Sequence, residues 1–116
     1  MDLFDTTQLG LERAISGAEM RQGVLAANVA NANTPGYKPK DVDFHSALRT
    51  AFASGGDVEK APITETTSDA VMRADGSGLD IDVEASKLSQ NGLEYQALVQ
   101  AARGRIDILE SAMGVR

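Results

Sequence analysis

Few side chains in this chain of 116 residues could act as a nucleophile or as a general base. His45 is the only histidine, and there is no cysteine. A serine nucleophile needs a base within hydrogen-bonding reach, and neither Ser16 nor Ser46 has a clear partner in the sequence. We therefore expect no catalytic residues and a protein that is not an enzyme.

The most acidic stretch, Asp75 to Glu84, could offer oxygen ligands to a calcium ion. A calcium loop of the EF-hand type, however, needs an oxygen ligand where this chain has Leu79, and the glycine at its sixth position is missing. The stretch also half-resembles a β-helix repeat, but it occurs once, and such repeats need stacked copies. We interpret it as a turn before a helix whose first turn Asp80 and Asp82 would cap, and expect neither a metal nor a cofactor.

The charge of the chain is −6 at pH 7, from 11 basic and 17 acidic residues. Affinity for nucleic acid comes mainly from clustered lysine and arginine, which are scattered here. The densest basic pair, Arg103 and Arg105, is followed by Asp107 and Glu110, as on a solvated helix face. Together with the missing catalytic groups, this predicts no nucleic-acid partner and no small-molecule substrate.

The first residues, Met1 to Asp5, lack the basic and apolar segments of a cleaved secretion signal. No apolar run approaches the ~20 residues that span a bilayer. By these tests the chain would be cytoplasmic, although an export route without such a signal would escape them.

Apolar residues at alternating steps of three and four predict two long amphipathic helices, over residues 7–33 and 83–114. The first series comprises Phe4, Leu11, Ile15, Ala18, Leu25, Val29 and Ala32. The second series comprises Leu88, Tyr95, Leu98, Ala102, Ile106, Leu109 and Met113. Such spacing is typical of a coiled-coil seam, so we expect these two seams, together with Asn28 and Asn31, to form the assembly interface. Gly10, Gly17 and Gly23 each weaken the first helix by ~1 kcal/mol and suit a helix that approaches very closely.

We expect a mainly α fold in one domain, in which the terminal helices pair as a coiled-coil-like hairpin or join helices of other copies. Residues 34–82 would contain a turn, a short helix over Phe44–Phe52, and a polar loop or hairpin. The strands of that hairpin would be Val71–Ala74 and Leu79–Ile81, with Asp75-Gly76 as the turn.

The end of the first helix carries the most informative pattern. Pro35 disfavours a helical conformation for Thr34, and Thr34-Pro35-Gly36-Tyr37 fits a type II turn, with glycine at the position that needs a positive φ. Asn28 and Asn31, three residues apart, share a helix face. Their amides would pair with the backbone or with a neighbouring chain, or they would be tolerated where the helix frays.

This stretch resembles the signature of bacterial flagellar rod, hook and hook-associated proteins. The matching residues are Asn28, Val29, Ala30, Asn31, Thr34, Pro35, Gly36 and Tyr37. The opening Met1–Phe4, the run Lys38–Phe44 and the stretches Leu79–Glu84 and Asn91–Leu98 resemble the basal-body rod subgroup found in the proximal rod. Gly76-Ser77-Gly78 departs from the Asn-Asn that is usual there, which leaves the hairpin geometry open.

The resemblance implies a structural subunit that polymerises through its terminal helices, anchors the axial structure of the flagellum and transmits torque for motility. It implies a position in the periplasmic rod, reached through the flagellar type III export channel without a cleaved signal peptide. The partners implied are further copies in a helical oligomer, other rod proteins, the rod–ring adaptor FliE, the membrane ring and the export gate.

Two alternatives share part of this pattern. A rod subunit of the FlgC type would have similar helices, but the order of the motifs fits it less well. A coiled-coil adaptor of another system would share the seams, yet it would not need the asparagine-rich helix end followed by the Thr34–Tyr37 turn.

Overall fold

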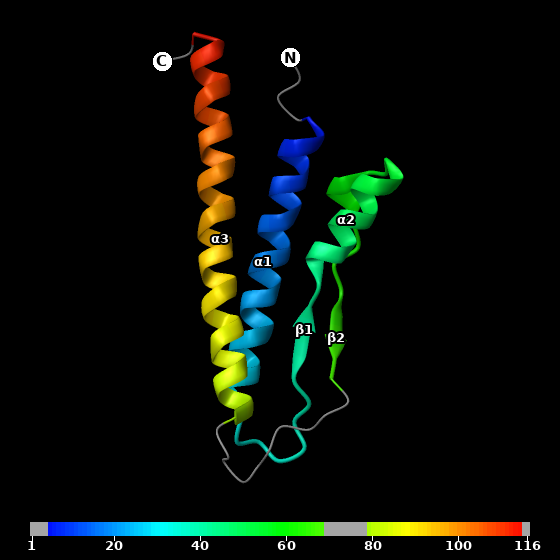
Figure 1. Cartoon of the computed structure of the whole chain (residues 1–116), viewed down its shortest axis with the longest axis vertical. Coiled ribbons are helices and arrows are strands. Elements are labelled where there is room, and N and C mark those ends of the chain that lie inside the picture. Colours follow the sequence, from blue (N-terminus) through cyan, green and yellow to red (C-terminus); the bar gives the residue numbers. More distant parts are fainter. Residues whose placement is uncertain (1–4, 69–78, 115–116) are drawn as a thin grey trace.

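The computed structural model describes residues 5–68 and 79–114 of the chain. Its elements, in chain order, are α1 (Thr6–Ala30), β1 (Lys40–Val42), α2 (Phe44–Ser54), the 3-10 helix η1 (Val58–Lys60), β2 (Glu65–Thr67) and α3 (Leu79–Ala112). The long helices α1 and α3 lie side by side and antiparallel, with β1, β2 and α2 along the other side of α1 (Figure 1). The molecule measures 60 × 31 × 14 Å. The prediction of a mainly α fold with two long terminal helices is confirmed.

Helix α1 begins and ends where side chains satisfy its free backbone groups. Asp5 accepts a hydrogen bond from the Gln8 amide, 2.8 Å away, as an N-terminal cap. At the other end the Asn31 side chain donates to the Ala27 carbonyl, 2.8 Å away. The helix therefore ends at Ala30 rather than at Asn33, because Asn31 already serves as its C-terminal cap.

The short helix α2 packs on α1 through aromatic rings that sit over glycines. A Cβ atom added to Gly17 would lie 2.5 Å from the Phe44 Cβ, and one added to Gly10 would lie 2.5 Å from the Phe52 Cζ. Both glycines are thus explained by close contact inside the chain. Asp43 caps the start of α2, and Gly55, with φ 68°, closes its end in a left-handed conformation.

The core is thin and lies where α1, α2 and β1 meet. Its buried cluster comprises Ala14, Ala18, Val42, Phe44, Leu48 and Ala61. Half of these side chains are alanine, which contributes little apolar area, so helix contact rather than a large core holds the elements together.

The predicted hairpin is wrong where it can be tested. The two strands that pair are β1 and β2, antiparallel, with Lys40 opposite Thr67 and Val42 opposite Glu65. Leu79–Ile81 is instead the first turn of α3, which starts before the predicted residue 83 because its half-buried Ile81 and buried Glu84 lie on the helix face toward α1. The other predicted strand, Val71–Ala74, and the Asp75-Gly76 turn lie outside the described residues. The assignment of the chain to one domain stays a prediction.

Candidate assembly interface

The two predicted seams lie within the chain, where α1 and α3 pack along most of their length. The buried members are Ala18, Leu25, Asn28, Ala32 and Ala102. The half-buried members are Leu11, Ile15, Val29, Asn31, Leu88, Tyr95, Leu98 and Leu109. The exposed members are Ile106 and Met113. Most of the seam is therefore covered by the chain itself, and its role in contacts with other subunits stays a prediction.

Asn28 is a fully buried hub at the lower end of α1. Its amide nitrogen donates to the Lys40 carbonyl, 2.6 Å away, and to Glu84 Oε2, 2.8 Å away. Its oxygen accepts from the Tyr37 hydroxyl at 3.1 Å and from the Lys40 amide at 3.0 Å. Both amide hydrogens and both lone pairs are thus used, and one side chain holds α1, β1 and α3 together.

The turn after α1 aims the chain back along the helix toward β1. The Tyr37 amide donates to the Thr34 carbonyl at 3.2 Å, and Gly36 has φ 79°, as a type II turn requires. Thr34, Pro35 and Gly36 are exposed, whereas Tyr37 is half-buried and reaches Asn28. Asn31 has a local role, because it caps α1 and accepts from the Thr34 hydroxyl at 3.2 Å.

An ion-pair network surrounds this hub. The Arg21 guanidinium makes two contacts with Asp41, 2.7 and 3.3 Å long, and Lys87 lies 3.8 Å from the same carboxylate. Burial raises the pKa of the Asp41 carboxyl, but hydrogen bonds from Arg21 and the Val42 amide, with the charges of Arg21 and Lys87, outweigh it and hold the pKa below its usual value. Lys87 also pairs with Glu84 at 3.6 Å. Charge therefore links α1, β1 and α3.

A second buried amide, Asn91, sits one turn farther along α3. Its nitrogen donates to the Ala18 carbonyl at 2.9 Å and to Gln22 Oε1 at 2.8 Å, while its oxygen has no partner among the described residues. The predicted interface included neither Asn91 nor Glu84, although both lie in stretches that resemble the rod subgroup. A signal for Asn91 existed, because it stands between Leu88 and Tyr95 at a seam position that an apolar residue would normally fill.

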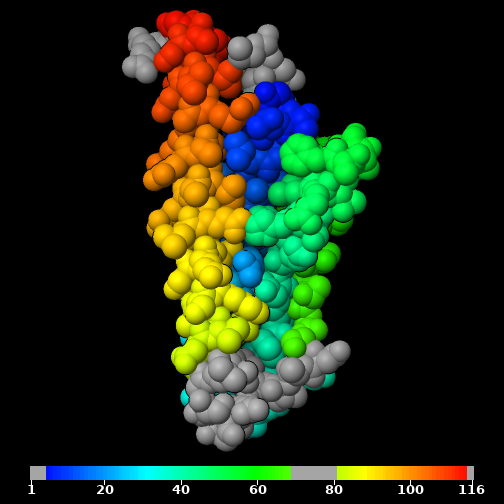
Figure 2. Space-filling view, in the orientation of Figure 1, coloured from blue at the N-terminus to red at the C-terminus, as the bar shows by residue number. Residues whose placement is uncertain are grey.

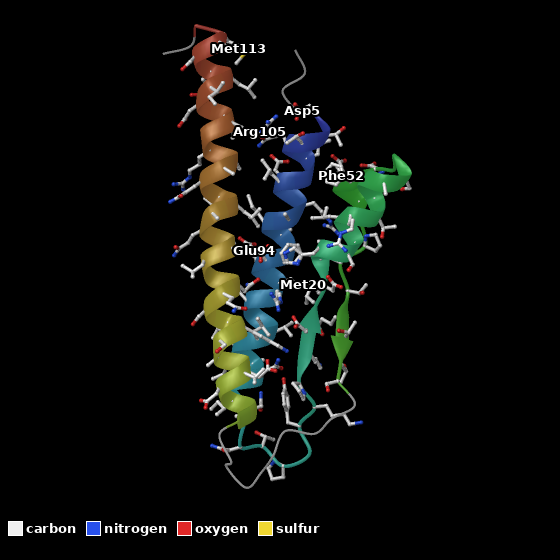
Figure 3. All side chains as sticks on the ribbon, viewed as in Figure 1. Asp5, Met20, Phe52, Glu94, Arg105 and Met113 are labelled. Carbon is white, nitrogen blue, oxygen red and sulfur yellow. The ribbon has the colours of Figure 1, made fainter. Side chains whose placement is uncertain are left out.

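Polar contacts also fasten the opposite end of the helix pair. Arg105 lies 2.9 Å from Asp5 and 3.2 Å from Gln8 Oε1 at the start of α1, and Figure 3 shows Asp5 and Arg105 facing each other. Residues of α3 beyond Arg105 continue past this point, as far as the exposed Met113 (Figure 3).

His45, the only histidine, has a structural contact. It lies on α2, stacks on Phe44 with ring centroids 4.1 Å apart, and hydrogen-bonds to Glu94 of α3. Figure 2 shows α3 and α2 flanking α1 on this face, so that the middle of α1 is visible only as a narrow strip. His45 and Glu94 are therefore a bridge between the two elements that flank α1.

The described residues fit neither a metal site nor a membrane span. Residues 5–68 and 79–114 contain no cluster of three or more histidine, aspartate or glutamate side chains that could hold a metal ion. No helix within the same ranges is long and apolar enough to cross a membrane.

Comparison with known proteins identifies the class. The family of flagella basal body rod proteins matches residues 11–38, which contain all but the first five residues of α1, the asparagines and the turn. The flagellar basal body rod protein FlgB of Bacillus subtilis is 31% identical over 125 residues, 97% of each chain. FlgB of Escherichia coli is 31% identical over 91% of each chain, and FlgB of Salmonella typhimurium is 27% identical over 95% of this chain and 97% of its own.

The chain therefore belongs to the flagellar basal-body rod proteins. Within that family it is most like FlgB, and the FlgC-type and adaptor alternatives are not favoured. It is a structural subunit of the flagellar basal-body rod and not an enzyme.

Proposed function

We propose that this chain is a subunit of the proximal rod, where it anchors the growing axial structure and transmits torque. The observation that carries the proposal is that the likeness to FlgB of Bacillus subtilis covers 97% of both chains, including both terminal helices. A torque-transmitting subunit has to resist sliding between its helices. The Asn28 and Asn91 hubs and the Asp5–Arg105 pair tie α1 to α3 at three levels, which supports such a role.

Assembly would proceed through the terminal helices. The seam residues hold the helix pair of one subunit in shape, in a coiled-coil-like arrangement, and the exposed members Ile106 and Met113 are free to contact other subunits. The neighbours are further copies in a helical oligomer, other rod proteins, the rod–ring adaptor FliE, and the membrane ring and export gate at the base. The subunit would reach the periplasm through the flagellar export channel without loss of a signal peptide.

The test is deletion of the gene in the organism that encodes the chain, followed by complementation with a tagged copy. We expect non-swimming cells whose basal bodies retain the membrane ring and lack the rod, with swimming restored by the copy. Antibody labelling of purified basal bodies should place the tag beside the membrane ring, and mass spectrometry should find an uncleaved N-terminus. Normal swimming in the deletion strain, or a tagged copy absent from basal bodies, would overturn the proposal.

A further inference from the structure

One glycine of α1, Gly23, has no explanation among the residues that the structure describes. Gly10 and Gly17 make room for phenylalanine rings, but a Cβ atom on Gly23 would meet nothing within 4 Å. Glycine in a helix interior is unfavourable relative to alanine, so a residue without side chain is retained there for some other contact.

The surroundings of Gly23 form a receptive surface. Gly23 and Glu19 line two adjoining hollows of about 370 and 510 Å³, one on each side of α1. The hollow toward β1 is lined by Met20 and Tyr37, and the hollow toward α3 is lined by Tyr95 and Gln96. The neighbouring Ala26 and Ala27 are exposed as well, so the backbone of α1 can be approached closely here.

Whereas the α1 face around Gly23 is hollow, the outward face of α3 carries side chains that protrude. Leu93, Ala97, Gly104 and Ile108 recur at steps of four and seven, which places them on one face, opposite the face that packs on α1. Leu93 is 68% exposed and Ile108 is 70% exposed, and a Cβ atom on Gly104 would meet nothing within 4 Å. With Ala97 and Gly104 between them, Leu93 and Ile108 mark an apolar strip along α3 that a second helix could cover.

The charge of α3 is low over residues 85–102, which form the part of the outward face that precedes Arg103. Between residues 85 and 102 the only charged residues are Lys87 and Glu94, and each pairs with another element of the chain, Lys87 with Asp41 of β1 and Glu94 with His45 of α2. A solvated helix face normally carries many charges, so these five turns are suited to burial against a protein surface.

We propose that the α1 face around Gly23 receives the outward α3 face around Gly104 of a second copy of this chain. The hollows beside Gly23 complement the protruding Ile108, which lies one turn from Gly104. Charge favours the same pairing, because Glu19 lies one turn from Gly23, whereas Arg103 adjoins Gly104 and makes no ion pair within the described residues. Glu19 accepts a hydrogen bond from Tyr95, and Lys40 and Glu65, which also line the hollow toward β1, carry opposite charges. Asp107 follows Arg103 one turn later, so the pairing is centred on Arg103 and Gly104.

The two surfaces differ, so the contact is heterologous. Each copy offers one α1 face and one α3 face, and a series of such contacts stays open at both ends or winds into a helix. This inference rests on the proposed rod function, because the contact generates the self-assembly which that function needs.

The natural absence of cysteine allows a clean cross-linking test. Copies with Gly23→Cys and copies with Gly104→Cys are expressed together in the deletion strain, and intact basal bodies are treated with a short bis-maleimide. We expect a 23–104 dimer of this chain and no dimer when either variant is present alone. The matched control pairs Gly104→Cys with Ala53→Cys, an exposed position on α2, and should give no dimer.

A second measurement separates folding from assembly. Gly23→Leu should fold as the wild type does, by circular dichroism and thermal unfolding of the purified monomer, and its incorporation into basal bodies should fall at least tenfold. Gly23→Ala should fold normally and should incorporate less well than the wild type but better than Gly23→Leu, because its methyl group takes part of the space that the contact needs. A Gly23–Gly23 dimer, a cross-link from position 23 only to other proteins, or normal incorporation of Gly23→Leu would overturn the inference while leaving the rod function intact. Wild-type chain missing from basal bodies would instead overturn the rod function.

Discussion

The Asn28 amide lies 2.8 Å from the Glu84 carboxylate, although the two residues are 56 positions apart in the chain. Both side chains are buried, so the end of α1 is fixed to the first turns of α3 by a charge-assisted hydrogen bond away from water. Because Asn28 also bonds Lys40 and Tyr37, the same side chain sets the path of the turn. The asparagine that the family resemblance marks therefore organises the fold of the subunit.

Replacement of Asn28 by alanine should destabilise the subunit strongly. It leaves the Lys40 amide and the Glu84 carboxylate without their buried partner, and unsatisfied buried groups cost about 1–3 kcal/mol each. We expect a lower urea midpoint, measured by circular dichroism on the purified monomer. Asn33→Ala, at an exposed position past the helix end, should change the free energy of unfolding by less than ~0.5 kcal/mol. Equal midpoints for the two variants would contradict the buried hub.

Two glycine-to-alanine substitutions in α1 should have opposite effects. Gly17→Ala forces a Cβ to within 2.5 Å of Phe44, so α2 must shift, and overpacking of this kind costs about 1–3 kcal/mol. Gly23→Ala meets open space and should stabilise the helix by up to ~1 kcal/mol. Thermal unfolding of both variants side by side is the measurement. A stabilised Gly17→Ala variant would show that the phenylalanine does not pack over this glycine.

The long helices could be predicted because their apolar periodicity continues over many turns. The positions of the strands could not, since β1 and β2 have three residues each and β2, Glu65–Thr67, is exposed throughout. Strands so short and polar leave no alternating pattern, and their pairing depends on Asn28 and Asp41, which hold β1 against α1. The leucine and isoleucine of Leu79–Ile81 suit a strand or a helix, and the long α3 that follows determines the outcome.

The polar contacts of the interface were partly predictable. Asn28 could be predicted as an interface residue because it belongs to a recognisable motif. The turn could be predicted because proline and glycine restrict the conformations of its backbone. Glu84 and Lys87 look like ordinary solvated residues in the sequence. Their partners lie on α1 and β1, and only the folded arrangement brings them together. The pairing of the two seams within the chain was expected from the predicted hairpin, and the structure shows which of their members it buries.

The Arg21–Asp41 pair should make stability depend on pH in the acid range. The folded-state pKa of Asp41 is lowered from 3.8, so its contribution to stability is present above that value and is lost as the pH falls through the lower, folded-state pKa. We expect the urea midpoint of the wild type to fall below pH 4 and that of Asp41→Asn to fall less over the same interval. The pKa values of Asp5 and Asp43 are lowered too, so some acid sensitivity will persist in the variant. Identical pH profiles would show that the ion pair contributes nothing.

His45→Ala should leave motility largely intact. The substitution removes a contact to Glu94 between two partly exposed side chains, and such contacts contribute ~0–1 kcal/mol. Swimming in soft agar should match the wild type, with a small decrease in melting temperature of the purified monomer. A non-swimming His45→Ala strain with normal protein levels would point to a functional site around this histidine.

Deletion of residues 109–116 should stop rod assembly without unfolding the subunit. Helix α3 reaches the start of α1 at Arg105, where it pairs with Asp5, and the residues that follow extend beyond this point (Figure 3). Ile106 is 44% exposed and Met113 is 54% exposed, so within residues 5–68 and 79–114 this end of α3 remains incompletely covered. The deletion removes Leu109 and Met113 from the seam and shortens the helix. We expect circular dichroism close to the wild type, and basal bodies without rods by electron microscopy.

Export is assayed separately, by detecting the truncated chain outside the cytoplasm, because a subunit that is made but not exported would also leave no rod. A deletion strain that exports the chain and builds normal rods would show that this end of α3 takes no part in assembly.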